Sequence, residues 1–167
     1  MVNIEECVNQ YGDYLYHIAY VYTKDAFLAE EVVQDVFFRL YRTQQFEERA
    51  ALKTYLTRIT INCCYDYLRK WKAKKVQLFD YFGGHSKGLE QIAVANHEKH
   101  EIIQQILKLP LKYREVLFLY CYDDLSIAEI SSFIHIPEST VRTRLQRARL
   151  KLKDGLPISD WEVLRNE

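Results

Sequence analysis

Few residues of this chain break helices. Its 167 residues include only three prolines and five glycines, the two residue types that most disfavour a helix interior. No apolar run reaches 18 residues, so the sequence shows no transmembrane helix. The first residues, MVNIEECVNQYGDYLYH, carry acids early and lack the apolar stretch of a signal peptide. We therefore expect a mostly helical, cytoplasmic protein that does not insert into a membrane.

The sequence also lacks the motifs of an enzyme. It contains no glycine-rich phosphate loop, no nucleophile motif and no convincing set of metal ligands. The segment HEKH at 97–100 differs from the zinc-protease pattern HExxH because its second histidine comes one residue early, and a polar helix start is the simpler interpretation. The four cysteines, without a secretory signal, are expected to be buried, reduced thiols. We therefore expect no catalytic activity, no cofactor and no metal.

Apolar residues, in contrast, are abundant and periodic. They make up 49% of the chain, enough for a core, and recur three and four residues apart as on one face of a helix. In the first half the pattern predicts three helices, over about 4–22, 25–42 and 51–74, with a loop at about 43–50. The second of these helices has Asp25 as its N-cap and an apolar stripe that ends in Leu40 and Tyr41. In the second half it predicts helices over about 98–108 and 112–122, a short helix capped by Ser126, and a last helix that opens at Ser139.

Residues 76–98 interrupt this periodicity. The segment FGGHSKG within them holds three of the five glycines, so we expect a flexible linker with room for a short helix at about 88–95. The predicted fold is all-α, with two small helical domains and a C-terminal helix-turn-helix. The expected boundaries are 1–75 for the first domain, 76–98 for the linker, 99–155 for the second domain and 156–167 for a tail.

The cations are unevenly distributed. The chain has a net charge of zero, yet IPESTVRTRLQRARLKLK at 136–153 holds four arginines and two lysines against one acid, Glu138. On a helix, one edge would be apolar, and the opposite face presents Ser139, Thr143, Gln146 and Arg147. The apolar edge consists of Val141, Leu145, Ala148 and Leu152. A short helix and a turn precede it, which is the arrangement of a helix-turn-helix whose second helix enters the major groove of DNA. A solvated helix with cations near its C-terminus is the alternative explanation of the charge.

A second basic segment, RKWKAKK, ends the helix predicted over about 51–74. Its cations surround Trp71 and follow Tyr55, Tyr65 and Tyr67 along the same helix. Aromatic rings beside a cationic track are how proteins hold unpaired bases, at roughly 1–3 kcal/mol per stacked base. Because most of these rings must serve the core, we expect one or two to be exposed.

Three segments resemble those of the extracytoplasmic-function (ECF) group of bacterial sigma factors, in the same order and spacing. AEEVVQDVFFRLYR (29–42) is similar to their polymerase-binding helix, and LKTYLTRITINCCYDYLRKWKAKK (52–75) to their promoter-melting helix. The stretch from LPLKYREV to LQRARLKLK (109–153) is similar to their C-terminal domain. The resemblance implies an initiation factor that gives core RNA polymerase its promoter specificity.

The resemblance also implies roles for individual residues. The upstream promoter element would be bound as duplex by the last helix, with Arg142, Thr143 and Arg147 as base readers within a surface of Ser139, Thr140, Arg142, Thr143, Arg144, Gln146, Arg147 and Lys151. The melted strand of the downstream element would be bound by Phe46, Tyr55, Asn62, Arg69, Lys70 and Lys72. Core RNA polymerase would be met by Gln34, Asp35 and Arg39. An anti-sigma factor, often membrane-bound in this family, is a further implied partner.

The chain departs from the family pattern in three places. His135 stands in the turn where the family usually has glycine, Tyr55 stands where tryptophan is most often seen, and the tail LPISDWEVLRNE is extra. Histidine can adopt a left-handed conformation at a cost, so the turn remains possible. A helix-turn-helix regulator that binds duplex DNA without polymerase would explain the second half of the sequence equally well, but not the basic, aromatic helix of the first.

Overall fold

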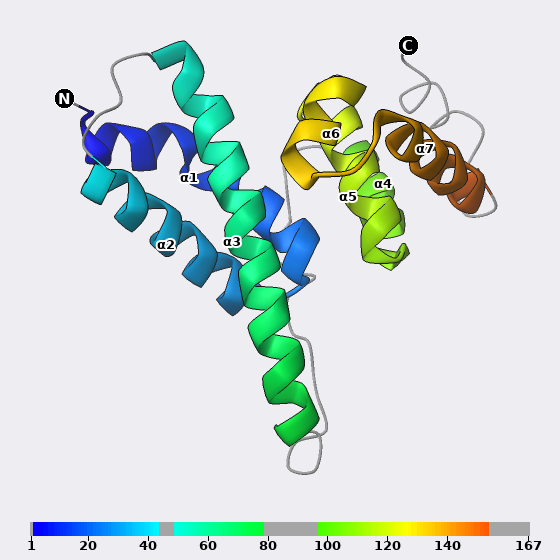
Figure 1. Ribbon diagram of the computed structural model, residues 1–167, viewed down its shortest axis with the longest axis horizontal. Coiled ribbons are helices and arrows are strands. Elements are labelled where there is room, and N and C mark those ends of the chain that lie inside the picture. Colours follow the sequence, from blue (N-terminus) through cyan, green and yellow to red (C-terminus); the bar gives the residue numbers. More distant parts are fainter. Residues whose placement is uncertain (1, 44–48, 79–96, 154–167) are drawn as a thin grey trace. The chain divides into compact units, whose positions relative to one another are not determined.

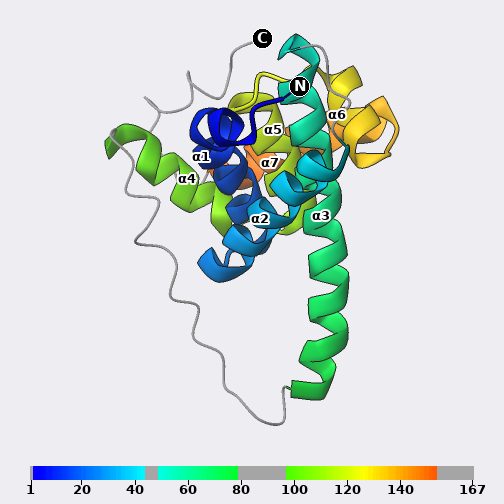
Figure 2. The same ribbon diagram turned by 90° about the vertical axis from the view of Figure 1, so that its left-hand side faces the viewer.

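The computed structural model (Figures 1 and 2) describes residues 2–43, 49–78 and 97–153. These residues form seven α-helices and contain no strand. The chain divides into two compact units, Met1–Gln91 and Ile92–Glu167. The predicted all-α class with two helical regions is therefore confirmed. None of the helices in the described ranges combines the length and the hydropathy of a membrane span.

The first unit consists of three helices that pack against one another. They are α1 (Ile4–Thr23), α2 (Ala26–Thr43) and α3 (Arg49–Leu78). Their shared core includes side chains with no exposed surface, among them Leu15, Ile18, Val32, Val36, Leu56 and Ile61. The amide N–H of Leu28 donates to the carboxylate of Asp25 at 3.0 Å, which confirms the predicted cap of α2.

The third helix is longer than its periodicity predicts. It begins at Arg49 and continues to Leu78, beyond both expected ends. Residues 43, 49 and 50 of the loop predicted over about 43–50 are therefore helical, and residues 44–48 lie outside the described residues. Its C-terminal end projects past α1 and α2 (Figures 1 and 2). The hydrophobic stripe fades here, and residues 69–74 are all exposed.

The second unit is built around α5 (Leu111–Cys121). This helix packs against α4 (His97–Lys108), α6 (Ile127–Ile134) and α7 (Glu138–Lys153). The apolar edge predicted for the last helix is buried in full and consists of Val141, Leu145, Ala148 and Leu152. These side chains fix the rotation of α7 about its own axis, because turning the helix would bring charged groups into the core.

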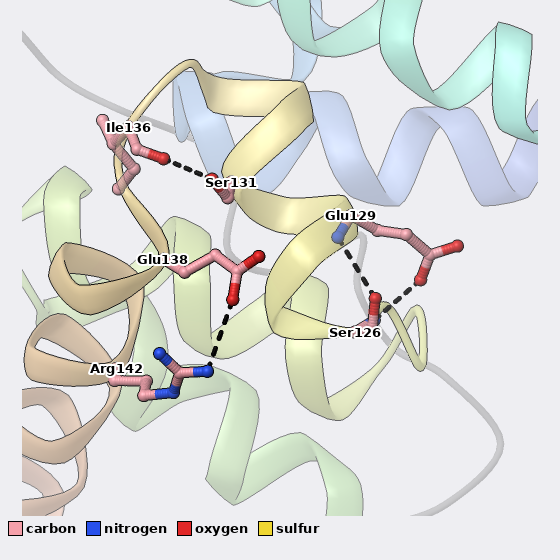
Figure 3. A network of polar contacts seen from close by, with 6 residues as sticks. All are labelled: Ser126, Glu129, Ser131, Ile136, Glu138 and Arg142. Atoms are coloured by element: carbon pink, nitrogen blue, oxygen red, sulfur yellow. Dashed lines mark hydrogen bonds and ion pairs between the residues drawn. The ribbon is translucent and has the colours of Figure 1, made fainter.

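Local hydrogen bonds define the helix-turn-helix. At the start of α6 the N–H of Glu129 donates to the Ser126 hydroxyl at 3.1 Å, and the Ser126 N–H donates to the Glu129 carboxylate at 2.8 Å (Figure 3). This reciprocal capping box confirms the cap predicted at Ser126. At the other end of α6, His135 has φ 57° and ψ 46°, the left-handed conformation that the turn requires. The Ser131 hydroxyl closes the turn by donating to the Ile136 carbonyl (Figure 3).

The start predicted for α7 at Ser139 is wrong by one residue. The helix begins at Glu138, and the carbonyl of Pro137 accepts from the N–H groups of Thr140 and Val141 at 3.0 and 3.1 Å. Ser139 therefore lies inside the first turn, and its carbonyl accepts the Thr143 hydroxyl at 2.9 Å. The helix thus starts one residue before the serine that the sequence favours, and the Pro137 carbonyl accepts its first backbone hydrogen bonds.

A partly buried ion pair joins α5 to α7. The Arg144 guanidinium lies 3.5 Å from the carboxylate of Glu115, whose side chain is only 3% exposed, whereas that of Arg144 is 26% exposed. A buried carboxylate left without its cation is costly, so this pair holds α7 in register with α5.

We predict that His135→Gly stabilises the protein. A non-glycine residue in the left-handed region carries a cost of about 1–2 kcal/mol, which glycine avoids at a smaller entropic cost, so we expect a gain of about 1 kcal/mol in the free energy of unfolding. Urea unfolding followed by helical circular dichroism measures it. The matched control is Ser132→Gly in the interior of α6, which should lose stability. A loss in both variants would show that the His135 side chain itself stabilises the turn.

We also predict that Arg144→Ala is strongly destabilising, by about 3 kcal/mol, because it removes the cation that lies 3.5 Å from the buried Glu115 carboxylate. The control is Arg142→Ala, which removes an arginine of the same helix from an exposed ion pair and should cost less than about 1 kcal/mol. Adding Glu115→Gln to Arg144→Ala should restore part of the loss, since an amide needs no counterion. Equal losses in the two single variants would contradict the structural role of the pair.

Candidate nucleic-acid interface

The face of α7 opposite its buried edge is polar and open to solvent. Of the eight residues predicted to bind the upstream element, six are exposed: Ser139, Arg142, Thr143, Gln146, Arg147 and Lys151. The other two, Thr140 and Arg144, are half-buried. The helix thus presents hydroxyl, amide and guanidinium groups together, which are the groups that read base edges and bind phosphates.

The arginines of α7 are not equivalent. Arg142 pairs with Glu138 one turn earlier at 3.3 Å, on the exposed first turn (Figure 3). Arg144 faces Glu115 on α5, as described above, and the guanidinium of Arg149 lies over the ring of Tyr120 at 5.4 Å. Arg144 and Arg149 therefore help to dock α7, whereas Arg142 and Arg147 stand on its open side. The helical spacing of α7 does not predict this role of Arg144, because it carries no information about a buried acid on another helix.

A second polar surface follows one face of α3. Tyr55, Asn62 and Arg69 are spaced seven residues apart, or about two helical turns, so they share a face over roughly 20 Å. Asn62 and Arg69 are exposed and Tyr55 is half-buried. The exposed Arg69 forms an ion pair with Asp66 on the same helix.

The basic end of α3 is open to solvent. Lys70 and Lys72 are exposed, and Trp71 between them is 43% exposed. Tyr65 and Tyr67 are half-buried, and the ring of Tyr65 packs edge-on against Tyr22 at 5.6 Å. One exposed ring among these aromatics agrees with the prediction that most of them serve the core. Phe46, the remaining candidate for this surface, lies outside the described residues.

The third predicted surface lies on α2. Gln34 and Arg39 are exposed, Asp35 is half-buried, and the charged groups of Asp35 and Arg39 are 3.9 Å apart. Arg39 thus forms only a long ion pair with Asp35 and stays in contact with solvent. This face carries both charge signs and can meet a protein partner.

Sequence reasoning missed an aromatic line beside these residues. Phe27, Phe38 and Tyr41 are 67%, 55% and 58% exposed. The prediction that Tyr41 belongs to the buried stripe of α2 is wrong. The spacing of apolar residues predicts which face of a helix is buried. It does not predict how far along that face the neighbouring helices extend. The spacing of 11 residues between Phe27 and Phe38, about three turns, could have revealed the line.

No group of metal-ligating side chains occurs within the described ranges. Cys63 and Cys64 are buried and Cys121 is partly buried. Burial raises the pKa of Cys63 and of Cys121 to about 11 and that of Cys64 well above its ordinary value. These thiols therefore stay protonated at neutral pH, which agrees with the expected role as small hydrophobic side chains.

Comparison with known proteins assigns both units. Residues 7–74 match the family model for Sigma-70 region 2, and residues 99–152 match that for Sigma-70, region 4. The ECF RNA polymerase sigma factor SigW of Bacillus subtilis (strain 168) is 32% identical over 165 residues, which cover 90% of this chain and 87% of SigW. SigM of the same organism is 32% identical over 157 residues, covering 91% of this chain and 94% of SigM.

A solved structure has the same fold. It is the sigma factor RpoE of Bartonella quintana in complex with the anti-sigma factor NepR, with a TM-score of 0.73 at 22% identity over 90% of this chain and 94% of that chain. The matched regions span most of α1–α3 and of α4–α7, the two units that carry the surfaces described above. The chain belongs to the ECF RNA polymerase sigma factors of the sigma-70 family, non-enzymatic proteins that recognise promoters and initiate transcription.

Proposed function

We propose that three surfaces of this sigma factor divide the steps of initiation. The open face of α7 reads the upstream promoter element as duplex, α3 captures the melted downstream strand, and α2 binds core RNA polymerase. The observation that carries this proposal is the orientation of α7, whose apolar edge is buried while the predicted base readers remain exposed. The work is divided between domains at 1–75 and 99–155, with 76–98 as linker and 156–167 as tail.

Base reading is assigned to Arg142, Thr143 and Arg147. All three are exposed on the open side of α7, within its first ten residues. The N-terminal part of a recognition helix is the part that enters the major groove. An arginine fork on guanine discriminates by roughly 1–3 kcal/mol, and the neighbouring Ser139, Gln146 and Lys151 supply further polar and phosphate contacts. Thr140 and Arg144 remain part of the proposed surface at its half-buried margin.

Strand capture is assigned to the polar face of α3. A base that leaves the duplex costs a few kcal/mol, which stacking and new phosphate contacts can offset. Tyr55 and Asn62 provide a ring and an amide, while Arg69, Lys70 and Lys72 provide exposed cations along the projecting half of the helix. Phe46 remains assigned to the same function.

Sigma factors bind core RNA polymerase, and for this chain we assign the contact to Gln34, Asp35 and Arg39. The exposed rings of Phe27 and Phe38 support the assignment, because aromatic side chains are enriched in protein interfaces and are otherwise rare on a free surface. We expect the protein to act in the cytoplasm, where core polymerase works. By analogy with RpoE bound to NepR, an anti-sigma factor, soluble or membrane-bound, is the expected inhibitor of this chain.

In vitro transcription tests the function directly. The full chain with core RNA polymerase should direct transcription from a subset of genomic fragments on which core polymerase alone is silent. Asp35→Arg should abolish holoenzyme assembly while helicity and thermal melting stay near wild type, because Asp35 is not part of the buried core. Asp13→Arg, the same charge change on the exposed surface of α1, is the control. Specific binding of duplex DNA by the chain without polymerase, and no transcription, would favour a stand-alone regulator.

Asn62→Ala separates melting from binding. Because the proposed contact of Asn62 forms only after a base has left the stack, the variant should lose open complexes more than closed complexes. Permanganate reactivity of unpaired thymines measures the former, and a closed-complex binding assay with core polymerase measures the latter. Thr54→Ala, another exposed position of α3, should change neither. An equal loss in the two assays would remove Asn62 from strand capture.

A further inference from the structure

One apolar side chain interrupts the polar face of α7. Leu150 is 59% exposed, whereas the other large apolar residues of this helix are buried. It follows Thr143 by seven residues, or about two turns, and Arg147 by three, so it lies on the open face together with both. A leucine side chain forms no hydrogen bond with a base or a phosphate. It therefore leaves an apolar spot within a surface of polar and cationic groups.

The cations nearest to Leu150 are not balanced by an acid of the described residues. Arg147, Lys151 and Lys153 all lie within three residues of Leu150 and are exposed, and across the described ranges none of them forms an ion pair. The three other cations of the helix have partners within the protein, as described above. A segment that carries both apolar and acidic side chains could therefore contact the leucine and these cations together.

Such a segment follows α7 directly in the sequence. Residues 154–167, which lie outside the described residues, read DGLPISDWEVLRNE and hold four acids against one arginine. Three of their apolar residues, Ile158, Trp161 and Leu164, are spaced three residues apart, and Asp160 and Glu162 flank the tryptophan. On a helix, that spacing would put the apolar side chains on one side, with the two acids at its edges.

We propose that segment 154–167 docks on the open face of α7 in the free sigma factor, with Trp161 against Leu150 and its acids beside the neighbouring cations. The segment thus covers the face that reads DNA until DNA displaces it. The inference rests on the function proposed for α7. The distances allow it, because the residues between Lys153 and Trp161 can span up to about 25 Å, whereas Leu150 lies only about 4.5 Å before the end of the helix.

Attachment to the same chain makes a weak contact sufficient. A short connection gives a segment an effective concentration in the millimolar range near its site, so one apolar contact and a few ion pairs can keep it docked. Exposed ion pairs contribute little each, and the phosphates of a duplex compete for the same cations. We therefore expect the segment to lower the affinity for duplex DNA and to yield to a site that also offers base contacts.

Tryptophan fluorescence tests the docking without DNA. The chain has two tryptophans, so Trp71→Phe leaves Trp161 as the only one in the full chain. In this background acrylamide should quench Trp161 weakly, and Leu150→Ala should raise the quenching toward that of free tryptophan. Val8→Ala, which removes an exposed apolar side chain of α1, is the control and should leave the quenching unchanged.

Two fluorescence results would overturn the docking. If Leu150→Ala quenches no more than its parent protein, Trp161 does not contact the open face of α7. If the protection of Trp161 disappears on dilution of the protein, the contact joins two copies of the chain rather than two parts of one.

Duplex DNA tests whether the docked segment covers the reading face. The ligand is a promoter fragment obtained by the transcription experiment, and the full chain is used without polymerase. Trp161→Ala should raise the affinity severalfold, and so should Asp160→Asn combined with Glu162→Gln. The control is Asp13→Asn combined with Glu30→Gln, which makes the same change in net charge at exposed positions of α1 and α2 and should have a much smaller effect.

Two binding results would contradict the inference. If neutralising the two acids raises the affinity but Trp161→Ala does not, the segment repels DNA by its charge without docking. If neither change raises the affinity, the segment does not cover the reading face. Failure of the proposed function is distinguishable from both, because Arg147→Ala would then bind the fragment as wild type does, whatever the fluorescence shows.

Discussion

The second unit depends on the burial of one edge of α7 against α5. Val141, Leu145 and Ala148 fix which side of the helix faces the core, and the pair of Glu115 with Arg144 sets its position along α5. A helix held in this way cannot rotate to hide its charges. Its cations are therefore presented outward in a fixed arrangement, which is what recognition of a rigid duplex requires. The chain achieves this with a net charge of zero, because specificity depends on where the cations stand and not on their total.

In the first unit, too, burial of one part of a helix determines which other part is open to solvent. In α3, Leu56 and Ile61 anchor the N-terminal half against α1 and α2, and the end of the helix projects beyond them with residues 69–74 exposed. Asn62 and Arg69 stand on the open face at the boundary and beyond it. Anchoring one half keeps the direction of the other half defined, because an α-helix is stiff over this length. The single strand proposed to bind here is flexible, so a straight polar face with cations would suit it better than a closed pocket.

Much of this arrangement was predictable from the sequence, and the failures have physical causes. Periodicity identified the helices and the buried edge of α7 because apolar spacing records burial directly. It misassigned Tyr41, since burial also depends on where neighbouring helices end, and it placed the start of α7 at Ser139 instead of Glu138. The pairing of Arg144 with Glu115 joins residues of separate helices, so no local pattern reveals it. Side chains whose partners lie on another element were thus the ones that the sequence could not assign.

The arginines of α7 differ in the interaction within the protein that each would lose on binding DNA. Arg144 and Arg149 hold partners on α5, so recruiting them would loosen the fold. Arg142 holds only Glu138, in an exposed pair one turn away, and such pairs are worth less than about 1 kcal/mol. A guanine that accepts both branches of its fork offers roughly 1–3 kcal/mol, so the exchange is favourable at the right base. A wrong base would leave Arg142 with its carboxylate and bring that carboxylate's charge near the DNA. In the role proposed for Arg142, the single acid of α7 would therefore sharpen the choice of sequence while it lowers the general attraction to DNA.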